Sequence, residues 1–556
     1  MKFAAVATIA AGLLVVCAQD SSTIRVTTRL VQVGVIVRDK NGPVTDLKKE
    51  DFKLFERGKE RRIAAFSMAA SGVPATGSGV KMPPNIFSNR FDRSAAAPSS
   101  VTILLIDGLN TLLMDQKLVR KSAIELLDTL KPQDRVALYT LGRELRVVHD
   151  FTNDFDELKA TIAKTKGLVT GMDSAKTDAE KLEDGPGLSG AWAAQDATIA
   201  LGAVQNRVTR TADALAAIGR HLAGVPGRKS LIWVSGSFPI GEGLSGGSVA
   251  KPRLPPPQAT AGPVVGGIPR GTPTQDFGSS MPAMTIYRDE LDKVTRALSE
   301  ANIALYPVDA RGLVAQSVER PTAPSAPEGI DTMRLLADRT GGKAFFNTND
   351  LLAAMRGAIE DGRVSYTLSF YPDPNELDGK FHDLKVKVDR RSVDVRYRTG
   401  YAAVADDASG QRDAGEELRA AAMRPLDSTE LGVSARADLV AGATPALRVA
   451  VSIDLSDVQV DQQGDRWVGK LDLYLLQIGV DGKVLDTSGV GIPINLTEAR
   501  YRDAAREGLV VSKTLTPVVG VLQIRAVVLD GRSGKIGSLR MPMGPIVAAA
   551  QKRAEK

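Results

Sequence analysis

Residues 101–111 read VTILLIDGLNT, and this stretch decides the fold of the chain. An almost uninterrupted apolar run ends at Asp107, and small or polar residues follow it. A continuous apolar run is typical of a strand buried on both faces, as in the parallel sheets of α/β domains. Ligands of such sheets bind just beyond the carboxyl ends of the strands. The stretch therefore predicts an inner parallel strand, with Asp107 at the edge where a ligand would bind.

The alternation of strands and helices continues from this stretch to about residue 346. Apolar residues at spacings of three and four indicate the helices, and short runs rich in β-branched residues indicate the strands. We expect helices at 115–130, 153–164, 193–222, 287–301 and 330–339, and strands at 134–141, 143–151, 229–236, 302–309 and from 342 onward. This order predicts an α/β domain with a doubly wound, mostly parallel, Rossmann-like sheet.

Six separated motifs occur in order along the same region. They are ILLIDGLNT (103–111), DRVALYTLG (134–142), PGRKSLIWVSGSFP (226–239), NIALYPVDARGL (302–313), TGG (340–342) and VRYRTGY (395–401). Together they resemble the von Willebrand factor type A (VWFA) domain, and more narrowly the acidobacterial VWFA-related domain family. The resemblance covers about half of the chain closely, and residues 23–66 are similar to the segment that precedes the domain in that group. It implies a VWFA fold and a role in adhesion or protein assembly.

The resemblance also implies a metal site, and its residues are only partly present. VWFA domains hold a divalent cation such as Mg²⁺ with an Asp-x-Ser-x-Ser loop, a Thr from a second loop and an Asp after the fourth strand. Here Leu109 replaces the first Ser of the loop, and no Asp directly follows the strand that ends near Ser235. The oxygen donors left as candidate ligands are Asp107, Asn110, Thr111, Ser235 and Asp309. The alternative is that Asp107 caps the following helix or accepts hydrogen bonds from loop amides.

Composition and turn signals divide the first part of the chain into modules. Residues 19–70 are expected to form a small β-domain, and residues 71–99, rich in Gly, Pro, Ser and Ala, a linker. The VWFA-like domain spans 100–402, and its strands after residue 364 either extend the main sheet or add a hairpin. Polar or Gly- and Pro-rich insertions interrupt it near 166–192 and 241–282. The second insertion is a candidate binding loop or a segment without a role.

The last part of the chain is predicted to be a second β-domain. A polar linker at 403–420 precedes a run of strands separated by Gly-containing turns. That pattern predicts a C-terminal β-sandwich at 421–546, followed by a tail at 547–556.

The first eighteen residues indicate export. Lys2 precedes an apolar stretch at 3–16, and the residues up to Ala18 form a plausible cleavage site, so residues 1–18 are predicted to be a signal peptide. The mature protein would begin at Gln19 and would lie in the periplasm or outside the cell. The alternative is a lipoprotein acylated at Cys17, the only cysteine of the chain. No other stretch is long and apolar enough to span a bilayer.

Composition argues against several classes of function. The net charge of +6 is mild, no basic block stands out, and aromatic residues make up 5%, so we expect no nucleic-acid partner. None of the three histidines, His149, His221 and His382, lies in a metal-binding spacing. The strand-to-loop turn at 235–237 reads SGS and lacks the GxSxG pattern of a nucleophile elbow. Without Cys17 the mature chain has no thiol chemistry.

Two classes of function remain. We predict a protein without enzymatic activity that mediates protein–protein interaction, adhesion or assembly at the cell envelope, through the carboxyl edge of the VWFA sheet. Its partner would be an unidentified protein or envelope component. The alternative is a metal-assisted or carboxylate-based enzyme, or a subunit of one, that uses the face carrying Asp107 and Asp309.

Overall fold

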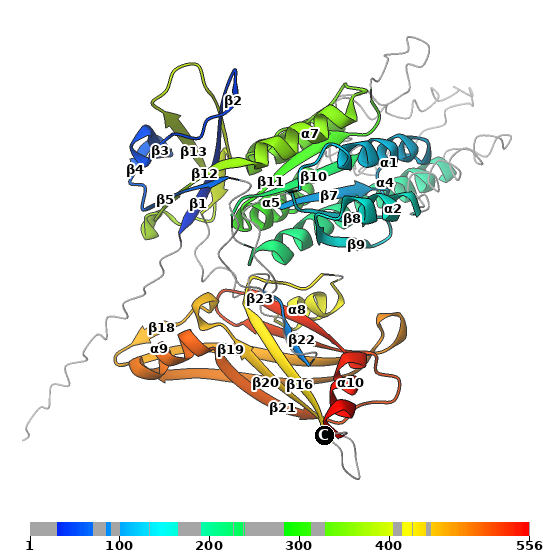
Figure 1. Cartoon of the computed structure of the whole chain (residues 1–556), viewed down its shortest axis with the longest axis vertical. Coiled ribbons are helices and arrows are strands. Elements are labelled where there is room, and N and C mark those ends of the chain that lie inside the picture. Colours follow the sequence, from blue (N-terminus) through cyan, green and yellow to red (C-terminus); the bar gives the residue numbers. More distant parts are fainter. Residues whose placement is uncertain are drawn as a thin grey trace, which may run out of the picture.

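The computed structural model describes residues 30–70, 85–90, 101–132, 134–164, 191–225, 227–236, 238, 283–312, 328–403, 414–424, 426–440 and 446–554. The predicted signal peptide with Cys17, the insertion at 241–282 and nearly all of that at 166–192 lie outside these residues. Figure 1 shows a central α/β module, a smaller β-unit beside it and a C-terminal β-module, coloured yellow to red, below both.

The α/β module is built on a five-stranded sheet of order β11-β10-β7-β8-β9. Four strands are parallel and the edge strand β9 runs antiparallel to β8. The strands are β7 (Val101–Asp107), β8 (Val136–Leu141), β9 (Leu145–Thr152), β10 (Lys229–Ser235) and β11 (Ile303–Asp309). All residues of β7, β8, β10 and β11 are buried, as their continuous apolar runs predict.

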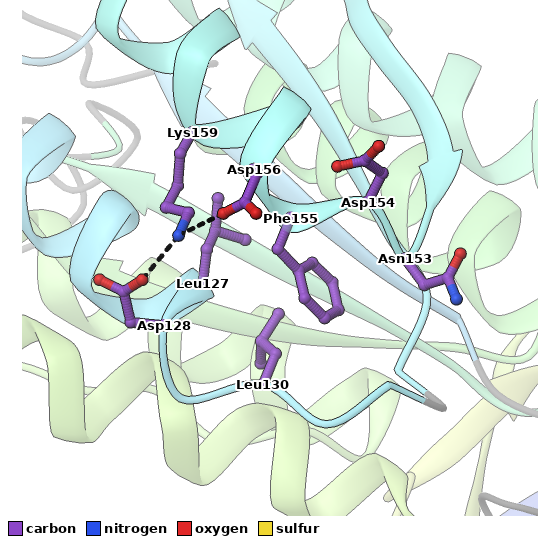
Figure 2. Close-up of a pocket in the computed structure, with 8 residues that line it drawn as sticks. All are labelled: Leu127, Asp128, Leu130, Asn153, Asp154, Phe155, Asp156 and Lys159. Carbon is purple, nitrogen blue, oxygen red and sulfur yellow. Dashed lines mark hydrogen bonds and ion pairs between the residues drawn. The ribbon is translucent and has the colours of Figure 1, made fainter.

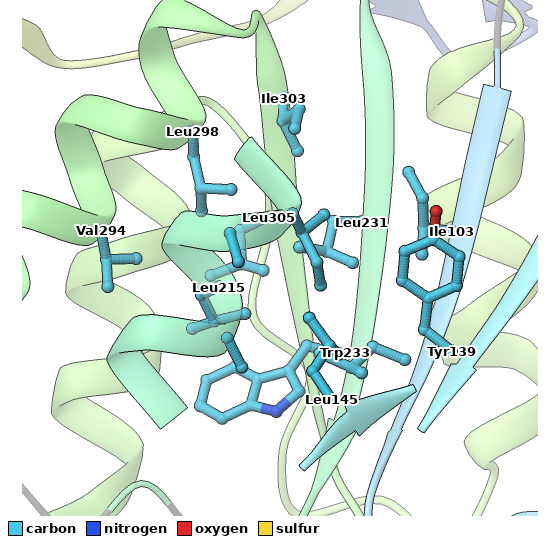
Figure 3. Close-up of a cluster of buried hydrophobic side chains, with 14 of the residues drawn as sticks. Ile103, Tyr139, Leu145, Leu215, Leu231, Trp233, Val294, Leu298, Ile303 and Leu305 are labelled. Carbon is cyan, nitrogen blue, oxygen red and sulfur yellow. The ribbon is translucent and has the colours of Figure 1, made fainter. Parts of the chain in front are cut away.

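Helices cover both faces of this sheet, because successive strand residues point to opposite sides. One face packs against α1 (Leu113–Leu127), α2 (Phe155–Lys164) and α7 (Leu351–Gly362). The other packs against α4 (Ala191–Leu222), α5 (Ala283–Glu300) and α6 (Glu328–Thr340). Figure 3 shows the core of the second face, where Trp233 and Leu305 meet Leu215 and Leu298. The module is therefore of mixed α/β class.

The strand predicted to begin at residue 342 is reduced to a single bridge. Phe345 pairs in parallel with Val308 and bonds to its neighbours in β11 through its main chain. A side chain at Gly342 would come within 1.9 Å of the Leu305 carbonyl oxygen, so the chain crosses too close to β11 to start a ladder there.

The strands after α7 do not extend the main sheet, which corrects one sequence expectation. They pair instead with the N-terminal strands and form two small sheets, β14-β1-β12-β5 and β15-β13-β3-β4, with β2 attached to β1. The strands are β1 (Val31–Asp39), β2 (Gly42–Pro43), β3 (Phe52–Glu56), β4 (Lys59–Arg61), β5 (Ala65–Ala70), β12 (Val364–Phe370), β13 (Phe381–Val388), β14 (Asp394–Tyr397) and β15 (Gly400–Ala402). The N-terminal β-domain thus needs both 30–70 and 364–402, because neither set alone buries its apolar faces.

A buried polar cluster joins these two halves. Glu56 on β3 accepts hydrogen bonds from Tyr401, from Arg61 (Nε to Oε2, 2.7 Å) and from His382 on β13 (Nδ1 to Oε1, 2.8 Å). The other ring nitrogen of His382 lies 3.0 Å from Oδ1 of Asp378. His382 is fully buried, so it is a core residue of this unit.

The C-terminal module contains two sheets that share one apolar core. The first has the order β21-β17-β16-β6, and the second has the order β18-β19-β22-β23 with β20 on β19. The elements are β16 (Val433–Val440), β17 (Ala446–Ile453), β18 (Asp461–Gln463), β19 (Arg466–Ile478), β20 (Val484–Thr497), α9 (Glu498–Glu507), β21 (Leu509–Leu515), β22 (Gln523–Asp530) and β23 (Ile536–Pro542). This arrangement is a β-sandwich.

Three segments predicted as linkers or tail contribute to this module. Strand β6 (Ile86–Ser88), from the predicted linker 71–99, pairs with β16. Helix α8 (Ala414–Met423), which begins within the predicted linker 403–420 and ends three residues beyond it, packs its Leu418 and Ala421 on β22 and β23. Helix α10 (Met543–Ala554) spans most of the predicted tail and buries Ile546. The prediction of linkers and a tail from composition was wrong for these segments. Each is short, and few of its residues are apolar enough to indicate a strand or helix without the core on which it packs.

Short 3₁₀ turns complete the fold at Lys49–Asp51, Pro374–Glu376, Leu455–Asp457 and Val480–Gly482. Among the described residues, no helix combines the length and apolar character needed to cross a membrane.

Candidate functional site at the carboxyl edge of the sheet

The carboxylate of Asp107, at the end of β7, is fully buried and accepts four hydrogen bonds. The main-chain N–H of Asn110 donates to Oδ1 (3.1 Å). The side chains of Asn110 (Nδ2, 2.9 Å), Trp233 (Nε1, 3.0 Å) and Ser235 (Oγ, 2.9 Å) donate to Oδ2. Burial raises the pKa of Asp107, and these hydrogen bonds oppose the rise. Asp107 is thus an internal acceptor that joins the ends of β7 and β10.

The loop after Asp107 is fastened by the same kind of contact. Asn110 also donates from Nδ2 to Oγ1 of Thr211 on α4 (2.8 Å). Thr111 Oγ1 accepts from the main-chain N–H of Gly236 (3.0 Å). A side chain at Gly236 would come within 2.7 Å of the Asn110 carbonyl oxygen, so only glycine allows this approach of β10 to the loop. Helix α1 begins after Leu112 with no side-chain cap, so Asp107 binds loop amides and does not cap the helix.

Asp309, at the end of β11, makes a separate ion pair. Its carboxylate accepts from Nε (2.9 Å) and Nη2 (2.9 Å) of Arg311, and from the main-chain N–H of the same residue (3.0 Å). Asp115, in the first turn of α1, lies close enough to interact electrostatically with the carboxylate of Asp309 and the guanidinium of Arg311. Burial and the negative charge of Asp309 raise the pKa of Asp115, and Arg311 lowers it.

The five predicted metal ligands therefore fall into two groups. Asp107, Asn110, Thr111 and Ser235 come together, whereas Asp309 is tied to Arg311. Asn110 Oδ1 is buried and has no hydrogen-bond donor. A Mg²⁺ ion needs near-octahedral oxygen ligands, and one free amide oxygen beside a carboxylate saturated by donors does not fit it. In the described part of the chain, no three His, Cys, Asp or Glu side chains gather as a metal site.

Apolar side chains are exposed at the same edge. Leu113 and Met114, in the first turn of α1, are 54% and 77% exposed, and Leu118 one turn later is 40% exposed. Met114 and Leu118 are four residues apart and so lie on one face of α1. Exposed apolar side chains that gather in this way, unlike single ones, mark interaction sites. Because α1 directly follows the Asp107 loop, these three side chains, with Asp115 and Arg311 nearby, form what we call the edge patch.

A pocket of about 550 Å³ lies at the other end of α1 and contains neither Asp107 nor Asp309. Figure 2 shows Lys159 reaching both Asp128 (2.8 Å) and Asp156 (2.8 Å) at its rim. The pocket is lined by Leu127, Asp128, Leu130, Asn153, Asp154, Phe155, Asp156 and Lys159. Most of its polar groups are paired with one another or bond the main chain at the start of α2.

Sequence reasoning missed the residues that complete the Asp107 cluster. Trp233 lies in the strand predicted at 229–236 and Thr211 in the helix predicted at 193–222, and neither is among the predicted site residues. A polar Thr211 within an apolar helix seam was the available signal. Nothing in the local sequence marks Trp233 as a donor, because its partner lies more than a hundred residues away. Of the edge patch, only Leu118 falls within the helix predicted at 115–130. Leu113 and Met114 lie just before that range, and none of the three is among the predicted site residues.

Comparisons with known proteins give only distant likenesses. No family model and no curated protein matches this sequence. Among solved structures, a von Willebrand factor type A protein from Catenulispora acidiphila matches at 9% identity and a TM-score of 0.23, covering 88% of this chain and 75% of that one. The ArnB paralog VWA2 from Sulfolobus acidocaldarius matches at 9% identity and a TM-score of 0.21, covering 87% and 78%. The three N-terminal domains of the type V pili tip protein Mfa5 from Porphyromonas gingivalis match at 8% identity and a TM-score of 0.24, covering 85% and 97%.

The matched structures thus include von Willebrand factor type A proteins, the family that the sequence motifs resemble.

Proposed function

We propose that this chain is an exported protein that binds a protein partner of the cell envelope at the carboxyl edge of its α/β sheet, without a metal ion. The observation that carries the proposal is the exposure of Leu113 and Met114 beside the Asp107 loop. Burying these side chains against a partner releases water from apolar surface, which favours association. A flexible methionine in such a surface also adapts to the shape of its partner.

The arrangement of charges supports binding that does not depend on a cation. The carboxylate of Asp107 accepts hydrogen bonds from donors of the protein itself, and the charge of Asp309 is neutralised by Arg311. The edge patch therefore offers apolar contacts with a paired charge at its border. Such a surface, with an apolar centre and a polar rim, is typical of protein–protein interfaces.

The binding proposal is tested by site-specific photocrosslinking in the cells that produce the protein. A photoreactive amino acid at Met114 is expected to give discrete adducts with a partner protein, unchanged by a metal chelator. The matched control is Val510 on β21, which is 61% exposed on a different module. Identical adducts from both positions, or adducts from position 114 that disappear with chelator, would contradict the proposal.

Export is tested by determining the amino terminus of the protein recovered from those cells. We expect Gln19 as the first residue and the protein outside the cytoplasm. An acylated Cys17 at the amino terminus would instead establish the lipoprotein alternative.

A carboxylate-based enzyme at the face of Asp107 and Asp309 is the other hypothesis from the sequence. No specific observation favours it, because each carboxylate is held by donors of the protein itself. It would gain support if Asp107→Asn or Asp309→Asn abolished a measured activity without unfolding the chain.

A further inference from the structure

Strand β6 reaches the C-terminal module from a distant part of the sequence. It lies between β5 of the N-terminal unit and β7 of the α/β module, yet it forms the outer strand of the sheet β21-β17-β16-β6. Ser88, Phe87 and Ile86 oppose Ser434, Ala435 and Arg436 in antiparallel register. Residues 85–90 therefore behave as an extended peptide bound to the edge of β16.

Two buried asparagines hold the ends of this peptide. The Asn89 side chain donates to the carbonyl oxygens of Ser428 (2.8 Å) and Leu431 (2.9 Å) and accepts from the N–H of Val433 (2.8 Å). At the other end, Asn85 donates to Oδ1 of Asp438 (2.8 Å). Its carbonyl oxygen accepts from Ala437 N (3.0 Å). The C-terminal module thus binds the asparagine side chains of the segment as well as its main chain. In strand addition, side-chain contacts of this kind provide specificity.

An arginine closes the contact. Arg90 donates to the carboxylates of both Asp454 (2.8 Å) and Asp457 and is mostly buried between them. A side chain at Gly432 would come within 2.2 Å of the Arg90 Nε atom, so the site leaves room for this guanidinium only because residue 432 is glycine. Phe87 packs against the core of the sandwich.

We propose that the edge of β16 is a strand-acceptor site that takes residues 85–90 from a second copy of this chain as well as from its own. The edge needs an occupant, because unpaired main-chain groups of an outer strand are costly when buried and invite pairing when exposed. Exchange between two copies preserves every contact described above, since the same residues fill the same site.

Cysteine pairing tests the exchange directly. Ser88 and Ser434 form a pair that is not hydrogen-bonded, flanked by the bonds of Asn89 and Val433 on one side. In such a pair the Cα atoms lie about 4.5 Å apart, which suits a disulfide. Full-length Ser88→Cys and Ser434→Cys chains, both carrying Cys17→Ser, are co-expressed and oxidised. We expect a disulfide-linked heterodimer.

Controls keep the outcome decisive. Ser88→Cys co-expressed with Val510→Cys, on the far edge strand, should give no heterodimer. The double variant Ser88→Cys/Ser434→Cys should close within one chain, which shows that the geometry allows the bond. The pair Ile86→Cys and Arg436→Cys, also not hydrogen-bonded, serves if the first fails to close. Closure within one chain with no heterodimer in the mixtures would overturn the proposal.

Discussion

At the end of β7, a single buried carboxylate organises the edge of the sheet. Asp107 receives donors from its own loop and from β10, and Asn110 extends the network to α4. A carboxylate in this position stabilises the loop only while its acceptor capacity is filled. The same residue that resembles a metal ligand in sequence therefore serves as a structural acceptor in the fold.

Removing this acceptor is expected to destabilise the chain strongly. In Asp107→Ala, the buried N–H groups of Trp233 and Asn110 lose their acceptor, and each such loss costs about 1–3 kcal/mol. We predict a decrease of roughly 3 kcal/mol or more in the free energy of unfolding, measured by urea titration.

The same variant separates the structural role from a metal role. If Asp107 were a cation ligand, Mg²⁺ at about 100 times its dissociation constant would add about 2.7 kcal/mol to the stability of the wild type and nothing to the variant. We expect equal unfolding of the wild type in chelator and in millimolar Mg²⁺, Mn²⁺ or Ca²⁺. A cation-dependent shift that disappears in Asp107→Ala would show that the metal interpretation is right.

Lys229, the first residue of β10, predicts a pH dependence of stability. Its side chain is buried and donates to the Val225 carbonyl oxygen, and burial lowers its pKa to about 7 from the usual 10.5. Between these pH values the Lys229 side chain is protonated in the unfolded chain but not in the folded one. The free energy of unfolding of the wild type therefore rises with pH from about 7 to 10.5, by at most about 1.4 kcal/mol per pH unit. Below pH 7 the ammonium group is charged in both states, so the cost of burying its charge is fully present and does not change with pH.

Lys229→Met should therefore be more stable than the wild type, with the largest difference at pH 7 and below and almost none near pH 10.5. Urea unfolding at pH 6, 8 and 10 measures this difference, and Lys117→Met, at an exposed position on α1, is the matched control. A difference that does not shrink with pH would mean that packing, and not the buried charge, sets the effect.

At the scale of elements, the end of α4 is capped by the C-terminal module. Thr429 donates from Oγ1 to the carbonyl oxygen of His221 (2.8 Å) and from its N–H to that of Arg220 (3.0 Å). Its hydroxyl also accepts from the N–H of Gly224 (2.7 Å). Helix ends leave main-chain groups without partners, so a threonine from another module satisfies them here.

Thr429→Val keeps the shape of the side chain and removes the hydroxyl. We predict a loss of about 1–2 kcal/mol in the free energy of unfolding, because the Gly224 N–H loses its partner within a packed contact. Thr514→Val, at an exposed position on β21, should change stability by less than about 0.5 kcal/mol. Equal effects of the two variants would contradict the capping role of Thr429.

Elements were predictable where the signal is local. The continuous apolar runs of β7, β10 and β11 gave their existence and their burial, and the turns at 463–464 and 481–482 separated strands of the sandwich. Pairing was not local. Strands β12 and β13 alternate like any half-buried strand, and this alternation does not specify that their partners are β1 and β3, some three hundred residues earlier.

At the scale of the whole molecule, the structural units do not follow one another in sequence order, because two of them combine strands from distant parts of the chain. We call this arrangement interlacing. The N-terminal unit closes only with strands from beyond α7, and the C-terminal sandwich closes only with β6 from before β7. Figure 1 shows the blue strand of residues 85–90 within the yellow to red module. Ion pairs from Asp361 on α7 to Arg38 and Arg396 also fasten the N-terminal unit to the α/β module.

This interlacing predicts that Asn89 controls the local stability of the sandwich edge. Asn89→Ala removes three hydrogen bonds, so main-chain amides of β16 should exchange with solvent at least about tenfold faster, which corresponds to about 1.4 kcal/mol. Hydrogen exchange read by mass spectrometry measures it. Arg436→Ala, which removes an exposed ion pair with Asp438 on the same strand, should leave the exchange of β16 nearly unchanged. Unaltered protection of β16 in Asn89→Ala would show that β6 contributes little to the edge.

By itself, the sequence determined the α/β alternation, the buried strands, the β-sandwich and the cluster of polar residues after Asp107. These follow from local periodicity, because burial on one or both faces leaves its mark on neighbouring residues. The tertiary structure alone decided which strands pair, that Trp233 donates to Asp107, that Arg311 holds Asp309 and that Leu113 and Met114 stay exposed. Those outcomes depend on contacts between residues far apart in the chain, and hydrogen bonding and packing select such partners only once the elements have assembled.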